Sequence, residues 1–171
     1  MLKVLTEGCE PKRATKFSAA IDLFAAEDVV IGAGETCKVP LGVCISDDSK
    51  WLYKNYLENG FDMDFKSFQL EFLQSHYLQL EPRSSLRAKG LIAGTGVVDL
   101  DFKNEVMIII HNPITGFNDK KEPTCICSSN ATSYRINKGE KIAQIMLCEH
   151  KSYLMGYESE TERVGGFGST N

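Results

Sequence analysis

The residues best suited to chemistry lie in the stretch EPRSSLRAKG. Arg83, Ser84 and Ser85 stand together there, and Arg87 and Lys89 follow closely. Guanidinium forks and short hydroxyl donors are what oxyanions bind, so this group predicts a polyphosphate site on a chain that is acidic overall. The alternative is a solvated helix start with Ser84 or Ser85 as its N-cap, and the residues alone leave both interpretations open.

Carboxylates come from two other stretches. In GTGVVDLDF, side chains two residues apart share one face of a strand, so Asp99 and Asp101 are expected on one side and Phe102 on the other. A carboxylate beside a phosphate site can take a proton from water or hold Mg²⁺. Asp22, in SAAIDLFAAED, poses the same choice. The alternative for Asp99 and Asp101 is a solvent-exposed position without a role in a site, and the alternative for Asp22 is a turn cap.

Two further features complete the candidate site. Gln144 is an isolated amide in the apolar run KIAQIM, and a buried amide needs a partner in the backbone or in a ligand. Residues 163–171, RVGGFGSTN, contain glycines that permit unusual backbone conformations. They also contain Phe167, whose ring could stack on a base, and Arg163, whose guanidinium could bind a phosphate. We interpret this segment as a flap that orders on a ligand; a frayed terminus is the alternative.

Short apolar runs separated by turn residues must position these groups. The runs break at residues 32–34, 103–104 and 138–140. Many short strands with such turns predict an all-β barrel or sandwich.

Two longer segments depart from the strand pattern. Residues 47–75 contain a possible helical turn over 51–57 that Asn59-Gly60 ends, and the residues after it fit a helix and a strand equally well. Residues 113–132 read as a long turn-rich loop, and loops of that length are often functional.

The composition fits one globular domain. The chain has 171 residues, of which 43% are hydrophobic and 25% charged. Its net charge of −4 argues against general nucleic-acid binding. It has no apolar run of the roughly 18 residues that cross a bilayer and no secretory signal, so we expect an intracellular protein with no membrane or nucleic-acid partner.

The six cysteines are interpreted as reduced thiols of a reducing compartment. A zinc site could be imagined from Cys125, Cys127, Cys148 and His150. The spacing disfavours it, because structural sites usually pair ligands two to four residues apart.

Five blocks, in order along the chain, resemble the trimeric deoxyuridine triphosphate nucleotidohydrolases (dUTPases): SAAIDLFAAED, PRSSLRAKG, GVVDLDFKNEV, GEKIAQIM and RVGGFGSTN. The resemblance implies a jelly-roll-like distorted barrel over residues 1–155 and a C-terminal arm, residues 156–171, that closes over an active site. It also implies a homotrimer with sites shared between subunits. The implied reaction is Mg²⁺-dependent hydrolysis of dUTP to dUMP and pyrophosphate.

The resemblance also implies a role for each matching residue. Asp99 would be the general base that activates water, and Asp22 would be associated with the metal through water. The remaining positions would bind substrate: Phe102 against the deoxyribose, Gly96 and the main chain of Met107 at uracil, Arg83, Ser84, Ser85 and Gln144 at the phosphates, Arg163 at the γ-phosphate, and Phe167 with the neighbouring Gly168 over uracil.

Several positions differ from the usual pattern of the family. Phe102 stands where tyrosine is usual, and Ser85 and Asn104 stand where glycine is usual. The arginine-to-phenylalanine spacing of the last block is one residue shorter. The segments near 47–75 and 113–132 are insertions relative to compact members, and we expect them to modify the trimer surface or access to the site.

Two alternatives compete with this function. A dCTP deaminase of the same fold would need a glutamate ten residues beyond Asp99, where this chain has Ile109. A catalytically idle nucleotide-binding or regulatory protein would not require Asp99, Arg83 and Phe167 together.

Overall fold

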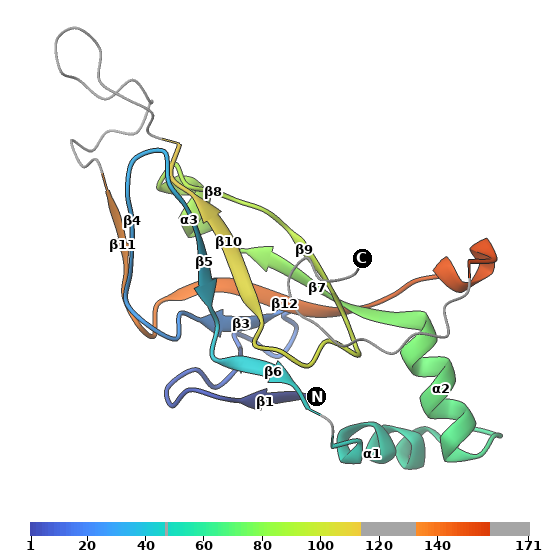
Figure 1. The fold of residues 1–171 in the computed structure, drawn as a ribbon. Helices are drawn as coiled ribbons and strands as arrows, with labels where there is room; N and C mark the ends of the chain where they lie inside the picture. Colours follow the sequence, from blue (N-terminus) through green and yellow to red (C-terminus); the bar gives the residue numbers. More distant parts are fainter. Residues whose placement is uncertain (47, 114–132, 158–171) are drawn as a thin grey trace, which may run out of the picture.

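The computed structural model describes residues 1–46, 48–113 and 133–157. Its strands are β1 (Leu2–Val4), β2 (Lys12–Arg13), β3 (Ile21–Phe24), β4 (Val29–Ile31), β5 (Thr36–Pro40), β6 (Val43–Ile45), β7 (His76–Pro82), β8 (Ile92–Ala93), β9 (Gly96–Asp99), β10 (Met107–His111), β11 (Tyr134–Ile136) and β12 (Lys141–Glu149). Its helices are α1 (Lys50–Asn59), α2 (Phe65–Ser75), α3 (Ser84–Ala88) and the 3₁₀ turn η1 (Ser152–Met155). The all-β expectation for the main body is confirmed (Figure 1).

The largest sheet has the strand order β2-β3-β12-β7-β9, and every pair in it is antiparallel. A second sheet has the order β5-β10-β8, and two smaller sheets pair β1 with β6 and β4 with β11. The side chains of β7 alternate, so that Leu78, Leu80 and Pro82 are buried. Leu78 and Leu80 join a single apolar core together with residues such as Leu23 and Ile145 from the same sheet. This alternation fixes which face of β7 meets solvent.

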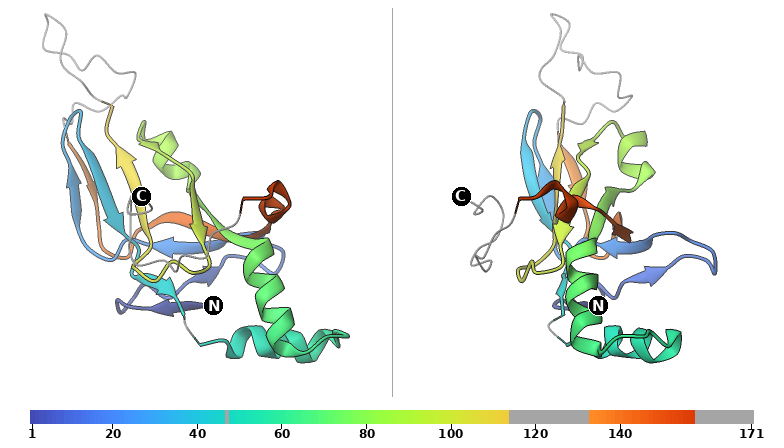
Figure 2. Two further views of the ribbon diagram at one scale, coloured as in Figure 1. Left: turned by 45° about the vertical axis from the view of Figure 1, so that its right-hand side comes forward. Right: turned by 90° about the vertical axis from the view of Figure 1, so that its right-hand side faces the viewer.

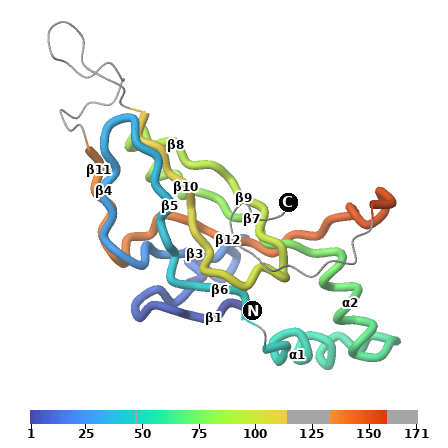
Figure 3. Tube along the Cα trace, in the orientation of Figure 1, coloured from blue at the N-terminus to red at the C-terminus, as the bar shows by residue number. Residues whose placement is uncertain are grey.

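The expected turns are present, but they do not close hairpins. Gly139 has a φ of +78° between β11 and β12, a backbone shape that glycine adopts easily. β11 pairs with β4, whereas β12 pairs with β3 and β7. In the same way the turn after β9 leads to β10, which belongs to the other sheet. Each turn therefore carries the chain from one sheet to another, as the Cα trace also shows (Figure 3).

The segment 47–75 contains the helices α1 and α2, which a short non-helical stretch over residues 60–64 joins. α1 ends at Gly60, which has a φ of +63°. α2 begins after Asp64, whose carboxylate accepts hydrogen bonds from the backbone N–H groups of Lys66 and Ser67. The choice left open between helix and strand is therefore settled as a helix from Phe65 onward. Both helices lie beyond one end of the sheets, as Figure 1 and the left view of Figure 2 show.

Candidate functional site

The stretch after β7 forms the predicted cationic group. Arg83 is the N-cap of α3 and makes no side-chain capping hydrogen bond, while Ser84 and Ser85 are the first helical residues. The helix start is therefore confirmed, but the alternative that a serine caps it is wrong. Both serines are exposed, so their hydroxyls are directed to solvent or to a ligand.

A cavity of about 240 Å³ opens beside this helix. It is lined by Glu81, Pro82, Arg83, Ser84, Arg87 and Gln144. Arg83, Ser84 and Gln144, three of the four predicted phosphate-binding residues that the structure describes, thus share one wall; Ser85 is not among the lining residues. Gln144 reaches the wall because β12 runs beside β7 and places it opposite Glu81. We refer to these six lining residues as the cradle.

Asp22 lies beneath the cradle and is only 4% exposed. Its β3 position is directly opposite Gln144 on β12. Its carboxylate is paired with the Arg83 guanidinium, and Lys141 Nζ lies 3.3 Å from its Oδ2 atom. A buried carboxylate needs such compensation, so Asp22 holds the Arg83 side chain at the base of the cradle.

Lys89 does not join the cradle, although the sequence places it in the same cationic group. Its ammonium donates to the Tyr134 hydroxyl and to Glu140 Oε1, which lies 3.0 Å away. These two hydrogen bonds, the one to Tyr134 first, raise the pKa of Lys89. Lys89 therefore ties α3 to the turn before β12.

Asp99 is the last residue of β9 and is exposed. Asp101 lies in the following turn and not on the strand, so the expectation that both carboxylates share one strand face is wrong. The turn is closed by a hydrogen bond from the backbone N–H of Phe102 to the Asp99 carbonyl. Phe102 is 6% exposed and belongs to the core.

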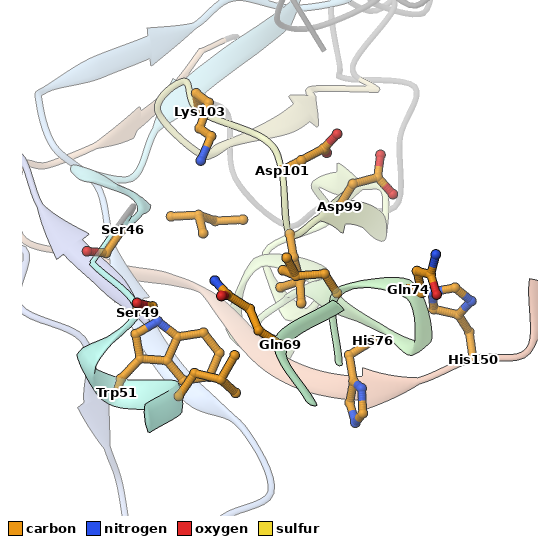
Figure 4. Close-up of a pocket in the computed structure, with 14 residues that line it drawn as sticks. Ser46, Ser49, Trp51, Gln69, Gln74, His76, Asp99, Asp101, Lys103 and His150 are labelled. Carbon is orange, nitrogen blue, oxygen red and sulfur yellow. The ribbon is translucent and has the colours of Figure 1, made fainter. Parts of the chain in front are cut away.

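A second cavity, of about 500 Å³, lies between this turn and the two inserted helices. Asp99, Asp101 and Lys103 line one side of it, and residues of α1 and α2 such as Trp51 and Gln69 line the other. Figure 4 shows the two aspartate carboxylates on the opposite side of the cavity from the Trp51 ring. The insertion therefore stands next to the predicted catalytic residue.

Asp99 and the cradle lie at opposite ends of β7. Asp99 is opposite Tyr77 near the beginning of β7, whereas Arg83 follows its last residue. Six residues of strand, at a rise of about 3.3 Å each, separate the two positions by roughly 20 Å. Figure 1 shows the same arrangement, with β7 running from α2 toward α3. One copy of the chain does not bring Asp99 to its own cradle.

The predicted uracil-binding backbone lies on strands with incomplete ladders. Gly96 begins β9, which is the edge of the largest sheet. Met107 begins β10, which pairs with β8 only at Ile110 and His111. Among the described residues, one side of each strand therefore carries backbone donors and acceptors outside any ladder, which a ligand with matching groups can use.

Several predicted residues lie outside the described part of the chain. Arg163, Phe167 and Gly168 belong to residues 158–171, and Cys125 and Cys127 belong to residues 114–132. Sequence reasoning also left residues out of its site. Lys141, which follows the predicted Gly-Glu turn directly, was given no part in it. Arg87 was grouped with Arg83 as a cation but was given no role of its own, although its spacing of four residues from Arg83 puts the two side chains on one helix face.

The chain matches known proteins over most of its length. A family model described as dUTPase matches residues 68–171. The deoxyuridine 5'-triphosphate nucleotidohydrolase of Rickettsia akari is 30% identical over 95% of this chain and 88% of the relative. That of Kluyveromyces lactis is 37% identical over 55% of this chain and 57% of the relative.

Solved structures agree in fold. The dUTPase from phage phi11 of S. aureus superposes with a TM-score of 0.60 and 23% identity, covering 99% of this chain and 97% of that one. The dUTPase of Streptococcus mutans has a TM-score of 0.57 and 22% identity, covering 88% of this chain and 95% of that one. The architecture is thus the jelly-roll-like fold of this enzyme class. The chain belongs to the dUTPase family.

In the described part of the chain, no helix has the length and apolar character that crossing a membrane requires.

Proposed function

We propose that this chain hydrolyses dUTP to dUMP and pyrophosphate. The chain belongs to the dUTPase family, and one observation carries the proposal: two surfaces lie at opposite ends of β7. One is the cradle, which offers arginine, serine and amide donors, and the other is the exposed Asp99. Donors of this kind bind the charged oxygens of a triphosphate, and a carboxylate is a suitable base for water.

In the proposed reaction, Asp99 accepts a proton from a water molecule as its oxygen attacks the α-phosphorus. The new P–O bond forms while the bond from the α-phosphorus to the bridging oxygen breaks, and pyrophosphate leaves. Arg83, Ser84 and Gln144 would hold the phosphate oxygens through this change. Fixed donors of this kind lower the barrier because they need no reorganisation when charge moves.

The separation of about 20 Å along β7 requires at least two copies of the chain in each site. We propose the homotrimer that the family resemblance implies, with Asp99 of one subunit beside the cradle of another. Cyclic symmetry repeats such a contact at each of three interfaces and gives three equivalent sites.

We further propose that the base is recognised by the backbone of β9 and β10 near Gly96 and Met107. Uracil presents alternating acceptor and donor groups on one edge, and an incompletely paired strand presents the complementary groups. The Phe102 ring would lie against the deoxyribose. Residues 156–171 would form an arm that closes the site, with Arg163 at the γ-phosphate and Phe167 and Gly168 over the base.

Mg²⁺ is the proposed cofactor. The described residues contain no group of three or more His, Cys, Asp or Glu that could hold a metal ion. Arg83 and Lys141 already face the buried Asp22 carboxylate and oppose direct metal binding there, but its Oδ2 atom has no hydrogen-bond partner among the described residues. Asp22 could therefore accept a hydrogen bond from a water on Mg²⁺, while the substrate phosphates would supply direct ligands. When bound, Mg²⁺ would offset the negative charge of the triphosphate. The solved phage phi11 and phage 80alpha dUTPases include a structural Mg(II) ion and a complex with dUpNHpp, respectively.

The direct test measures pyrophosphate release from the four common dNTPs, dUTP and UTP, with and without Mg²⁺. We expect Mg²⁺-dependent release from dUTP alone. Equal cleavage of all nucleotides would contradict the proposed base recognition, and no cleavage of any would contradict the activity. Ammonia release from dCTP, measured in the same reactions, would indicate the deaminase instead.

A further inference from the structure

We propose that Arg87 is a phosphate-binding residue that supplies the cradle with its second guanidinium. The inference rests on the proposed function, because it assigns a residue to the phosphate end of the same site. Arg87 is in α3, and its side chain lines the cavity together with Arg83, Ser84 and Gln144.

The backbone explains why the two arginines face the same cavity. Arg83 is the N-cap of α3, and Arg87 follows four residues later, one turn further along the helix. Residues at this spacing are neighbours on one helix face. The helix is held in place by Leu86, which is 1% exposed and belongs to the core. Arg87 is therefore presented by a fixed turn of backbone.

The two arginines differ in what they contact. The Arg83 guanidinium pairs with the buried Asp22 carboxylate, and its side chain is 33% exposed. Arg87 is exposed, and it has no side-chain hydrogen bond or ion pair with residues 1–46, 48–113 or 133–157. One nitrogen of the Arg83 guanidinium is thus committed to Asp22, whereas no nitrogen of the Arg87 guanidinium is committed to another described residue, so all its donors are available to oxyanions.

The charge of the cavity wall gives an independent argument. Glu81 also lines the cavity, and its carboxylate accepts a hydrogen bond from Gln79 at 3.1 Å. With Arg83 paired to Asp22, a wall without Arg87 would have no net positive charge to attract a phosphate chain. Arg87 cancels the remaining negative charge of Glu81 at the position where the predicted phosphate ligands converge, so the wall no longer repels a phosphate chain.

The test compares the parent with Arg87→Ala, Arg87→Lys and the control Arg135→Ala. Arg135 is also an exposed arginine, but it pairs with Asp28 and does not line the cradle. We expect Arg87→Ala to raise KM for dUTP about tenfold, the effect of losing one charge-assisted contact, with a smaller change in kcat. Arg87→Lys should recover part of the loss, because lysine keeps the charge but not the fork. The control should behave as the parent.

A second measurement is independent of the reaction: calorimetric binding of inorganic tripolyphosphate with Mg²⁺. We expect affinity to fall about tenfold in Arg87→Ala and to remain unchanged in Arg135→Ala. If the parent hydrolyses dUTP but Arg87→Ala matches it in KM and in tripolyphosphate affinity, this inference is overturned and the proposed function stands. If no nucleotide is cleaved but tripolyphosphate affinity still falls in Arg87→Ala, the phosphate site stands and the proposed function fails. A parent that does not bind tripolyphosphate overturns the inference.

Discussion

At the residue scale, Asp22 and Asp99 are two carboxylates in opposite environments. Asp22 is 4% exposed and compensated by Arg83 and Lys141, so removing its charge would disturb the cradle. Asp99 is exposed at the end of an edge strand, and its carboxylate lies at the rim of a cavity. A group that must accept a proton from water needs the second environment, since water has to reach it.

The substitution Asp99→Asn tests this role, because asparagine keeps the shape of the side chain but does not accept a proton. We expect turnover of dUTP to fall by about a hundredfold or more, the range for losing a general base, while nucleotide affinity stays within about threefold. Single-turnover pyrophosphate release and equilibrium binding of a non-hydrolysable analogue measure the two effects. Unchanged turnover would remove Asp99 from the mechanism.

A different carboxylate, Asp28, contributes to the response of stability to acid. The backbone N–H of Lys138 donates to Asp28 at 2.8 Å, and Arg135 donates to its other oxygen. These hydrogen bonds, the one from Lys138 first, lower the pKa of Asp28 below its ordinary value of 3.8. A lowered folded-state pKa contributes stability above the unfolded pKa and loses it as the pH falls through the folded value.

We therefore expect Asp28→Asn to be less stable than the parent near pH 6, and the difference to shrink as the pH falls below 3.8 toward the lower folded-state pKa. Urea unfolding of both proteins between pH 6 and pH 3, followed by circular dichroism, measures it. A difference that stays constant over this range would mean that the Asp28 charge has no part in holding the turn before β12.

At the element scale, the inserted helices form an aromatic cluster of their own. Phe68 lies at the centre, with ring centroids 4.4 Å from Phe61 and 5.5 Å from Tyr56. Trp51 of α1 meets Phe72 of α2 edge to face at 5.5 Å. Neither Phe68 nor the buried Leu52 belongs to the main core. The insertion therefore has its own buried centre beside the Asp99 turn, and it joins the main core through Phe72, which packs against that core.

Phe68→Ala should loosen this unit without unfolding the sheets. Removal of a buried phenylalanine ring costs about 3 kcal/mol, which corresponds to a roughly hundredfold loss of protection from amide exchange in a locally opening unit. Hydrogen exchange by mass spectrometry should show this loss over residues 50–75 and little change in β7 and β12. Equal loss throughout the chain would show that the helices and sheets unfold together.

The sequence predicts the strands better than their pairing. Alternation and turn residues predict β9, β10, β11 and β12, because these signals are local. Which strands pair depends on contacts far apart in the sequence, so the β4–β11 and β5–β10 pairs could not be predicted. The α2 helix was ambiguous because Phe65, Phe68 and Phe72 have helical spacing while the alternation that precedes them suggests a strand.

The candidate site, too, could be predicted from the sequence only in part. Arg83, Ser84 and Gln144 come together as predicted, since two neighbouring strands lead to one cavity. The Asp22–Arg83 pair could not be predicted, because it joins β3 to α3 across the strand between them. The cavity between the Asp99 turn and the insertion also needs tertiary packing that no local pattern specifies.

At the scale of the whole molecule, β7 separates the two halves of the proposed site. The cradle follows its last residue, and Asp99 lies beside its beginning. A chain folded in this way would be inactive alone, so activity would depend on assembly. This arrangement allows the two halves of the site to be disabled in different subunits.

The most direct measurement mixes Asp99→Asn subunits with Arg83→Ala subunits by joint refolding, after sedimentation shows that each variant alone assembles like the parent. Each variant alone should release almost no pyrophosphate from dUTP. In a random one-to-one mixture, about one quarter of the sites would combine an intact Asp99 with an intact Arg83 from different subunits, and the account predicts about that fraction of parental turnover. A mixture that stays as inactive as its two components would contradict the shared site.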